Sequence, residues 1–350
     1  MYSIMSERGI RICFAWAGFP QYAARCVGAF VRATGYECVV TALRPDAALG
    51  MEDVCNCPVI WTKGRTPVVG CPELEGVTHL FVTGWFLPQY NELVRKVRRE
   101  GGRVIALMDN DATVGSSARE RILAFLKGVK FRFSISRMFD GYIVPGKSGR
   151  QLLERYGVRP DLIRVGMYSA DASVFHDGAP LAERPKRLIY VGQYVERKNV
   201  AALVEAFRVE NRGDWRLDLY GCGPVAIAAG DGVGVHGFLQ VEELSGEYRK
   251  ARAFWLGSHE EHWGVVVHEA ALSGCVLALS NRVGAAADFA GRDNAVIFDP
   301  ESGADMRRAM REVMDMTDDR LVQAQRESLE LASRIGLNTF VEAVRRGLQS

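Results

Sequence analysis

The part of the chain that constrains the fold most is a helix-like run between two strand-like runs, within residues 253–280. The run AFWL precedes this helix and the run CVLAL follows it, which predicts a β-α-β unit of a parallel sheet. Gly264 and Gly274 bound the apolar stretch, so we expect the helix to begin near the first glycine and to end at the second. Ligands of such sheets bind at the carboxyl ends of strands, so the turn before this helix is the first candidate site.

Two carboxylates flank the predicted helix start: Glu261 on the turn before it and Glu269 within the helix. A helix start offers unpaired N–H groups and the positive end of a dipole, which together favour a diphosphate. We expect the N–H groups near Val265 and Val266 to bind that diphosphate. Glu261 can then accept hydrogen bonds from a sugar, and Glu269 from a ribose. The alternative is that both glutamates are solvated acids beside a surface helix.

Four further segments occur in the order expected for one known family: LIYVGQYVERKNVAALVEAF (188–207), LDLYGCGP (217–224), VHGFLQVEEL (235–244) and SNRVGAAADFAGRDNAVIFDP (280–300). With the glutamate motif, they make residues 188–300 resemble the donor domain of family 4 retaining glycosyltransferases of the GT-B fold (glycosyl transferases group 1). The resemblance implies metal-free, cofactor-free transfer of a sugar from a nucleoside-diphosphate sugar to a hydroxyl acceptor, with retention, in glycan or glycolipid biosynthesis. The acceptor class stays open among sugars, lipid-linked molecules and small molecules.

The resemblance also assigns roles to residues. Lys198 takes the position of the family's diphosphate-binding lysine, and Asp288 a position where glutamate is usual. Gly18 takes the position of a glycine near the donor phosphate, and a simple tight turn is its alternative role. We expect Lys198, Glu261 and Asp109 to be catalytic. The expected donor-binding residues are Gly18, Gln193, Arg197, Lys198, Gly221, Gly223, Gly237, Phe238, Leu239, Glu261, Gly264, Val265, Val266 and Glu269.

Gln193 is a departure from the family, which usually has an arginine on the diphosphate at this position. Glutamine offers a weak neutral donor, whereas arginine offers a permanent charge and a planar fork. Arg197 is our candidate substitute, and a solvated turn residue is its alternative role. The departure keeps a catalytically weak nucleotide-sugar-binding protein open as an alternative function. A sugar-nucleotide epimerase of similar two-lobed fold is the other.

The first half of the chain repeats the strand and helix alternation, with strand-like runs near residues 11–18, 36–43, 79–85, 102–109, 141–146 and 162–168. A length of 350 residues with 48% hydrophobic and 25% charged residues suits two cores. We therefore predict an α/β protein with two Rossmann-like doubly wound domains that face each other across a cleft (GT-B). Residues 1–178 form the acceptor-binding domain and residues 179–336 the donor-binding domain. In the family, a helix like residues 337–350 crosses back to the first domain.

The run Asp109, Asn110 and Asp111 ends one of these strands. We expect Asp109 to orient an acceptor or donor-sugar hydroxyl, with a helix cap or loop acid as the alternative. An acidic metal site, as in the other large glycosyltransferase fold, is a further alternative. We favour no metal, because Lys198 and the helix start already supply positive charge.

Basic charge gathers in one region: eleven Lys or Arg stand against four acids from Arg95 to Arg137. Residues 119–137 mix six basic residues with apolar ones, which suits either a helix on an anionic membrane or an ordinary surface helix with a buried stripe. No nucleic-acid-binding module is recognisable. The start lacks a signal peptide and no apolar run reaches about 20 residues, so we expect a cytoplasmic protein, or one peripheral to the inner face of the membrane.

The eight cysteines agree with that compartment. We expect buried free thiols at Cys13, Cys26, Cys38, Cys222 and Cys275. Cys55 and Cys57 have one residue between them, whereas zinc knuckles commonly have two, so a zinc site is not expected.

Overall fold

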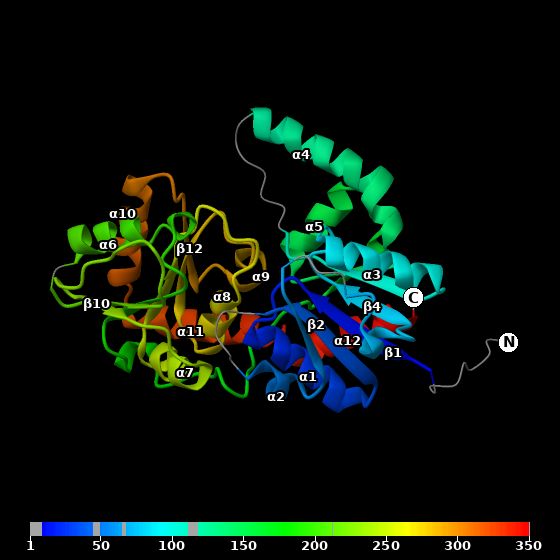
Figure 1. The fold of residues 1–350 in the computed structure, drawn as a ribbon. Helices are drawn as coiled ribbons and strands as arrows, with labels where there is room; N and C mark the ends of the chain where they lie inside the picture. Colours follow the sequence, from blue (N-terminus) through cyan, green and yellow to red (C-terminus); the bar gives the residue numbers. More distant parts are fainter. Residues whose placement is uncertain (1–8, 45–49, 65–67, 111–117, 212, 350) are drawn as a thin grey trace. The chain divides into compact units, whose positions relative to one another are not determined.

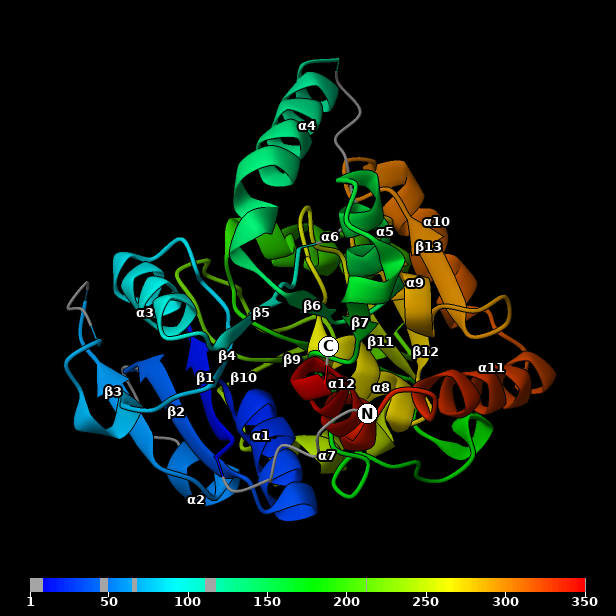
Figure 2. The same cartoon turned by 90° about the vertical axis from the view of Figure 1, so that its right-hand side faces the viewer.

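The computed structural model describes residues 9–44, 50–64, 68–110, 118–211 and 213–349. The chain forms two compact units. Unit 1 comprises Met1–Ser169 and Leu337–Ser350, and unit 2 comprises Ala170–Gly336. Each unit is built on one parallel sheet with helices on both of its faces (Figures 1 and 2).

Unit 1 has a seven-stranded sheet in the order β3-β2-β1-β4-β5-β6-β7. Its strands are β1 Arg11–Trp16, β2 Glu37–Leu43, β3 Val59–Thr62, β4 His79–Val82, β5 Arg103–Leu107, β6 Gly141–Val144 and β7 Ile163–Val165. Its helices are α1 Gln21–Thr34, α2 Met51–Cys55, α3 Pro88–Arg99, α4 Ala118–Lys130, α5 Lys147–Arg155 and α12 Leu337–Gln349. A π-helical turn, Phe131–Ile135, extends α4.

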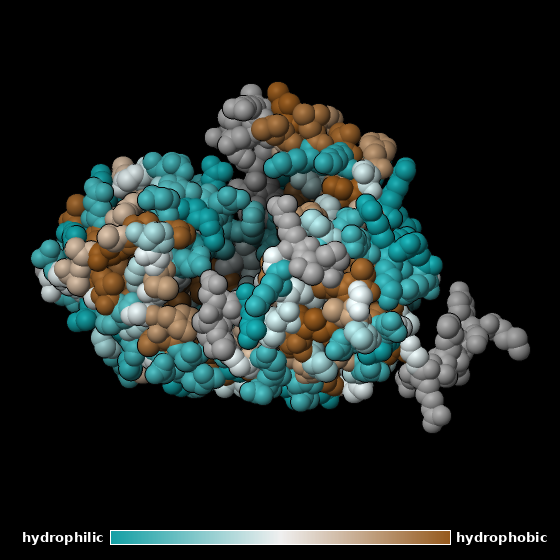
Figure 3. All heavy atoms as spheres, viewed as in Figure 1, coloured by the Kyte–Doolittle hydropathy of each residue, from teal (hydrophilic) through white to brown (hydrophobic). Residues whose placement is uncertain are grey.

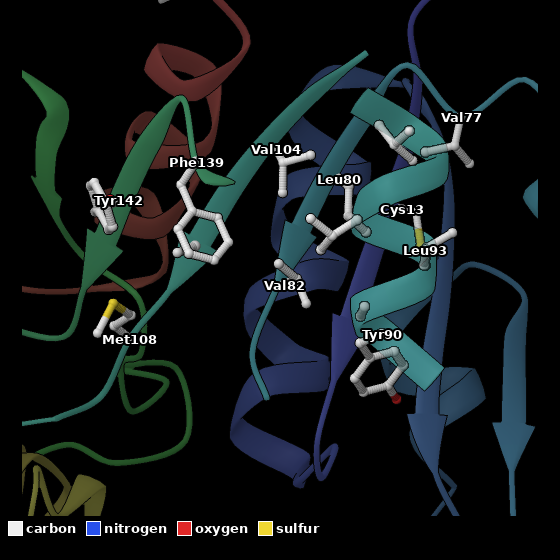
Figure 4. Close-up of a cluster of buried hydrophobic side chains, with 14 of the residues drawn as sticks. Cys13, Val77, Leu80, Val82, Tyr90, Leu93, Val104, Met108, Phe139 and Tyr142 are labelled. Carbon is white, nitrogen blue, oxygen red and sulfur yellow. The ribbon is translucent and has the colours of Figure 1, made fainter. Parts of the chain in front are cut away.

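The sheet of unit 1 is covered on both faces, which explains why its central strands read as unbroken apolar runs. On one face, Phe14 of β1 contacts Phe30 of α1 and Phe340 of α12. On the other, Cys13 and its neighbours pack with Leu93 and other residues of α3 in a buried cluster (Figure 4). Successive residues of β1 thus serve two different cores.

Unit 2 has a six-stranded parallel sheet in the order β10-β9-β8-β11-β12-β13. Its strands are β8 Arg187–Val191, β9 Arg216–Tyr220, β10 Val233–His236, β11 Ala253–Leu256, β12 Val276–Ser280 and β13 Ala295–Phe298. Its helices are α6 Val200–Glu210, α7 Val241–Lys250, α8 Val265–Leu272, α9 Ala286–Phe289, α10 Gly303–Met314 and α11 Asp318–Ala332. The predicted helix after residue 264 is α8, which lies between β11 and β12 as expected.

The boundary between the units differs from the predicted one at residues 178 and 179. The units divide between Ser169 and Ala170. Residues just after this point are held by unit 2: the Ser245 hydroxyl donates to the Val174 carbonyl at 2.6 Å. The buried Arg184 guanidinium donates to the carbonyl of Ala179 in the same stretch and to the carbonyl of Ser273 after α8. This stretch is rich in proline and charged residues, a composition typical of a linker. Hydrogen bonds from the buried side chains of Ser245 and Arg184 nevertheless hold it against unit 2.

Two local features also differ from the sequence expectations. The short elements α2 and β3 follow β2 and were not predicted. Cys222 is exposed, because it lies on the loop after β9 and not on the strand itself. Asp111 lies outside the described residues.

Helix α12 returns to unit 1, where it packs beside α1. The Arg345 guanidinium donates to the carbonyl of Ala33 at the end of α1, at 3.0 Å. Phe340 and Val344 of α12 are fully buried. Unit 1 is therefore assembled from two separate stretches of the chain.

Candidate functional site

The sheet of unit 2 changes direction between β8 and β11, and the loops after these two strands leave it at the same edge. There the backbone N–H of His259 donates to the carbonyl of Arg197 at 2.8 Å. The Arg197 guanidinium in turn donates to the carbonyl of Glu260 at 3.2 Å. The two loops therefore hold each other at the switch point, which is where such sheets bind ligands.

Lys198 and Glu261 meet across these loops. Lys198 closes the short 3₁₀ turn Glu196–Lys198, and its ammonium group forms an ion pair with Glu261 Oε2. The two side chains are only 11% and 12% exposed. Arg197 lies 4.0 Å from the same oxygen and is half exposed. The structure thus brings the predicted cation and the predicted sugar-binding carboxylate together, with a second cation beside them.

The loop that carries Glu261 is also fixed from its other side, by the loop after β12. The Ser280 hydroxyl donates to the carbonyl of Ser258 at 2.6 Å, and the N–H of Gly284 donates to the carbonyl of Glu261 at 2.9 Å. The first bond does not involve Glu261, and the second uses its backbone and not its carboxylate. A substitution of that side chain should therefore leave the loop in place.

Helix α8 begins beside this ion pair. Its N-cap, Gly264, has φ +87°, in the left-handed region that favours glycine. A Cβ atom on Gly264 would lie 3.2 Å from Glu261 Cγ, so the helix start and the carboxylate are neighbours. The N–H groups of Val265 and Val266 have no acceptor in the helix's own hydrogen-bond ladder. This combination of N–H groups, helix dipole and nearby cations forms an anion site.

Glu269 lies one helical turn further along α8 and points toward α7. The Tyr248 hydroxyl donates to Glu269 Oε2 at 3.2 Å. Burial raises the pKa of Glu269 to about 7, although the hydrogen bond from Tyr248 acts in the opposite direction. The carboxyl group therefore changes its charge near neutral pH.

The glycines after β9 allow two loops to approach closely. A Cβ atom on Gly221, which has φ +139°, would lie 1.9 Å from the carbonyl oxygen of Gly192. A Cβ atom on Gly223 would lie 2.3 Å from the carbonyl oxygen of Tyr194. Any side chain at either position would push the loops apart, so both glycines have a structural reason to be present.

The other predicted residues of unit 2 lie at the same edge of the sheet. Gln193 is exposed, and its carbonyl accepts a hydrogen bond from the Tyr190 hydroxyl at 2.8 Å. Gly237 follows β10, and its carbonyl accepts from the N–H of Gly221 at 3.3 Å. Phe238, next along the chain, is 62% exposed, and Leu239 is half-buried. An exposed aromatic ring on this loop is available for contact with a planar ligand.

The candidates of unit 1 lie at the carboxyl edge of its own sheet. Gly18 follows β1, is exposed and has no atom within 4 Å of a built Cβ, so the backbone does not require glycine there. Asp109 follows β5 and accepts a hydrogen bond from the Tyr168 hydroxyl at 3.4 Å. That ring packs against Trp16 and Tyr22. Asp109 is thereby positioned by an aromatic cluster that sequence reasoning missed.

Sequence reasoning also missed two residues around α8. Tyr248, which holds Glu269, sits at an apolar helical position of α7 and has no motif of its own. His268 stands directly before Glu269, is fully buried and makes two backbone hydrogen bonds. A histidine in the mainly apolar run VVVHEAAL was the available signal.

Within the described ranges, no group of three or more His, Cys, Asp or Glu side chains is arranged to hold a metal ion. Cys55 and Cys57 bring their sulfur atoms within 3.7 Å of each other.

None of the helices for which coordinates are described is long and apolar enough to cross a membrane.

Comparison with known proteins relates part of the chain to a known family. Residues 173–328 match the family model of glycosyl transferases group 1. No curated protein sequence matches the chain. Many solved structures do share its fold.

One of these structures is Anabaena Alr3699/HepE in complex with UDP and glucose, with 13% identity, a TM-score of 0.73, and coverage of 97% of this chain and 100% of that chain. The same Anabaena protein was also solved with UDP-glucose. Sucrose-phosphate synthase from Thermosynechococcus elongatus has 14% identity and a TM-score of 0.73, over 97% of this chain and 98% of that chain. WaaG, a glycosyltransferase involved in lipopolysaccharide biosynthesis, has 14% identity and a TM-score of 0.61, over 95% and 98%. At such identities the likeness shows the fold, and it confirms the predicted pair of Rossmann-like domains of GT-B type.

Proposed function

Because residues 173–328 form a glycosyl transferases group 1 domain in a chain with the GT-B fold, we propose that the protein is a retaining glycosyltransferase. It moves a sugar from a nucleoside-diphosphate sugar to an acceptor hydroxyl, in glycan or glycolipid biosynthesis. The observation that carries this proposal is the meeting of Lys198, Glu261 and the start of α8 at the switch point. The Anabaena structures with UDP and UDP-glucose support a donor of this class.

The proposed reaction breaks the bond between the anomeric carbon and the diphosphate and forms one to the acceptor oxygen. Negative charge develops on the departing diphosphate, so the residues that stabilise this charge supply much of the acceleration. Lys198, Arg197 and the N–H groups of Val265 and Val266 do this in our proposal. The departing phosphate takes the acceptor's proton. No metal is required in this scheme, because the cations and the helix start carry the charge.

The two glutamates have separate tasks in the proposed complex. Glu261 leaves its ion pair with Lys198 when the donor arrives, so that Lys198 binds phosphate and Glu261 binds sugar hydroxyls. Glu269 accepts hydrogen bonds from the ribose. Its half-buried setting makes a paired carboxylate more favourable than an unpaired one. In unit 1, Asp109 orients a hydroxyl and Gly18 lies near the donor phosphate.

Release of nucleoside diphosphate from a panel of nucleotide sugars tests this function. We expect one donor to be turned over in the presence of acceptor, and we expect Glu261→Gln to abolish turnover while the variant still binds UDP. Nuclear magnetic resonance of the product then reports whether the anomeric configuration is retained. Binding without turnover of any donor would favour the weak nucleotide-sugar-binding protein that the exposed Gln193 suggests. Conversion of the donor alone, seen by chromatography, would favour an epimerase.

We further propose that the protein works in the cytoplasm at the inner face of an anionic membrane, and that it contacts lipid through α4. This helix has two different faces. On its inner face, a Cβ atom at Gly128 would lie 2.9 Å from the ring of Tyr156. Phe131, just past α4, packs against the same ring at a tilt of 40°, with centroids 5.3 Å apart. That face is therefore anchored to unit 1.

The outer face of α4 is apolar and exposed. Ile122, Phe125, Leu126 and Val129 recur at spacings of three and four residues and are 60%, 70%, 55% and 39% exposed. In Figure 1, α4 projects away from the sheet of unit 1, and in Figure 3 the same region carries a hydrophobic patch. The exposed basic residues nearby are Lys127, Lys130, Arg132 and Arg137. An apolar stripe flanked by cations complements an anionic bilayer.

Co-sedimentation with lipid vesicles tests the contact. We expect binding to phosphatidylglycerol vesicles, weaker binding to phosphatidylcholine, and a loss of about tenfold or more in Phe125→Glu, since a buried phenylalanine side chain is worth about 1.5–3 kcal/mol. Val322→Glu, at an exposed valine of α11, is the matched control and should bind as the wild type does. Equal binding of both variants would refute the role of α4. Dimerisation lost only in Phe125→Glu would show that a second copy covers this face.

A further inference from the structure

His268 is a fully buried polar residue in the same helix that begins at the anion site. Its Nδ1 atom accepts a hydrogen bond from the backbone N–H of Ala170 at 3.0 Å. Its Nε2 atom lies 3.0 Å from the carbonyl oxygen of Ala332. A backbone N–H can only donate and a carbonyl can only accept, so the ring must carry its proton on Nε2 and be neutral.

The two partners of His268 occupy special places in the chain. Ala170 is the first residue of unit 2, directly after the chain has left unit 1. Ala332 ends α11, shortly before unit 2 ends at Gly336 and the chain returns to unit 1. One imidazole therefore holds both of the segments through which unit 2 is connected to unit 1.

The surroundings keep this imidazole in one orientation. Its ring stacks on Phe289 of α9, with centroids 4.5 Å apart and an angle of 12° between the planes. Burial lowers the pKa of His268 to about 4, so the neutral ring that both bonds require is present at neutral pH. A charged ring could not accept the bond from Ala170, because both of its nitrogens would be donors.

We infer that His268 is a positioning residue that couples the anion site at the start of α8 to both segments that connect unit 2 with unit 1. The identification of the anion as a donor diphosphate rests on the proposed function. An anion bound at the start of this short helix stabilises its helical form. A more firmly held α8 keeps His268 on its two partners for more of the time. By linkage, loss of these two bonds must weaken anion binding to the same extent.

Hydrogen exchange measures this coupling directly. In uniformly ¹⁵N-labelled protein, we expect the Ala170 amide to exchange slowly in the wild type and at least tenfold faster in His268→Phe, which keeps a ring of similar size. Saturating UDP should slow exchange at Ala170 in the wild type by threefold or more. In His268→Phe, UDP should still protect the amides at the start of α8 but should leave Ala170 unchanged. A purely structural histidine would not make the Ala170 amide respond to UDP.

Two further variants complete the test. His268→Asn places an amide oxygen near the position of Nδ1, so it should restore slow exchange at Ala170. It also serves if the phenylalanine variant does not fold. His79→Phe is the matched control, because it replaces a buried histidine of unit 1. In this variant the Ala170 amide should exchange at the wild-type rate.

Equal exchange at Ala170 in wild type and His268→Phe would overturn the inference, as would equal UDP protection of Ala170 in both. If UDP protects no amide of α8 in the wild type, the proposed function and the coupling fail together. In that case, the exchange rates of the Ala170 amide in UDP-free wild type and UDP-free His268→Phe still decide whether His268 holds Ala170.

Discussion

Replacing Glu269 with glutamine should stabilise the protein at alkaline pH and much less at acidic pH. The pKa of this half-buried carboxyl is raised from 4.5 to about 7 in the folded protein. Between these values the native state binds more protons than the unfolded chain, so stability falls as the pH rises. Glutamine has the same shape, can still accept the hydrogen bond from the Tyr248 hydroxyl, and carries no charge at any pH.

The size of the effect follows from the two pKa values. Each tenfold difference in proton affinity corresponds to about 1.4 kcal/mol. Ionisation of Glu269 should therefore lower the free energy of unfolding by at most about 3 kcal/mol at pH 8 and by about 1 kcal/mol at pH 5. For a domain of the size of unit 2, the gain at pH 8 corresponds to a rise in melting temperature of up to about 6–12 °C.

Thermal unfolding of wild type and Glu269→Gln, followed by circular dichroism at pH 5 and pH 8, checks this expectation. Glu260→Gln is the matched control, because Glu260 is an exposed glutamate of the neighbouring loop, and it should change the melting temperature little at either pH. An equal gain of Glu269→Gln at both pH values would mean that the carboxyl is not titrating in this range. An unchanged melting temperature of Glu269→Gln at pH 8 would refute the view that burial raises the pKa of Glu269.

Three further outcomes are expected. Lys198→Met should weaken UDP binding, measured by calorimetry, by about tenfold or more, since a hydrogen bond to a charged group contributes about 1.5–3 kcal/mol; unchanged affinity would remove this lysine from the diphosphate site. Gly221→Ala should lower the free energy of unfolding in urea by at least about 2 kcal/mol, because its Cβ atom would overlap a backbone carbonyl, whereas Gly237→Ala, which has open space, should not; similar losses would contradict this reading. Gln193→Arg should strengthen UDP binding at low salt and less at high salt, and a gain independent of salt would contradict an electrostatic cause.

The sequence predicted the fold well because the signals were local and repeated. Most strands of the two sheets are short and mainly apolar. Helix α8 begins directly after Gly264 and ends two residues before Gly274. The partnership of Lys198 and Glu261 could be expected only from their positions after two neighbouring strands. The resemblance supplied that strand order, since nothing in the spacing of residues 198 and 261 predicts it.

The remaining features depend on tertiary contacts that no local pattern encodes. The Tyr248 hydroxyl reaches Glu269 because α7 and α8 pack side by side, and the sequence of either helix is compatible with many partners. The unit boundary lies earlier than the predicted one, because residues after Ala170 are held by hydrogen bonds from buried polar groups such as Arg184. Both misses arise from hydrogen bonds between residues far apart in the chain.

The return of α12 to unit 1 sets an order of assembly during synthesis on the ribosome. Unit 2 is one continuous stretch, so it can fold as soon as its own residues have emerged. Unit 1 begins earlier yet must wait, because Phe340 and Val344, which fill its core, are translated only after all of unit 2. Until then the apolar surface of α1 that α12 covers stays open to water, so the nascent first half is the stage at which a chaperone would be most needed.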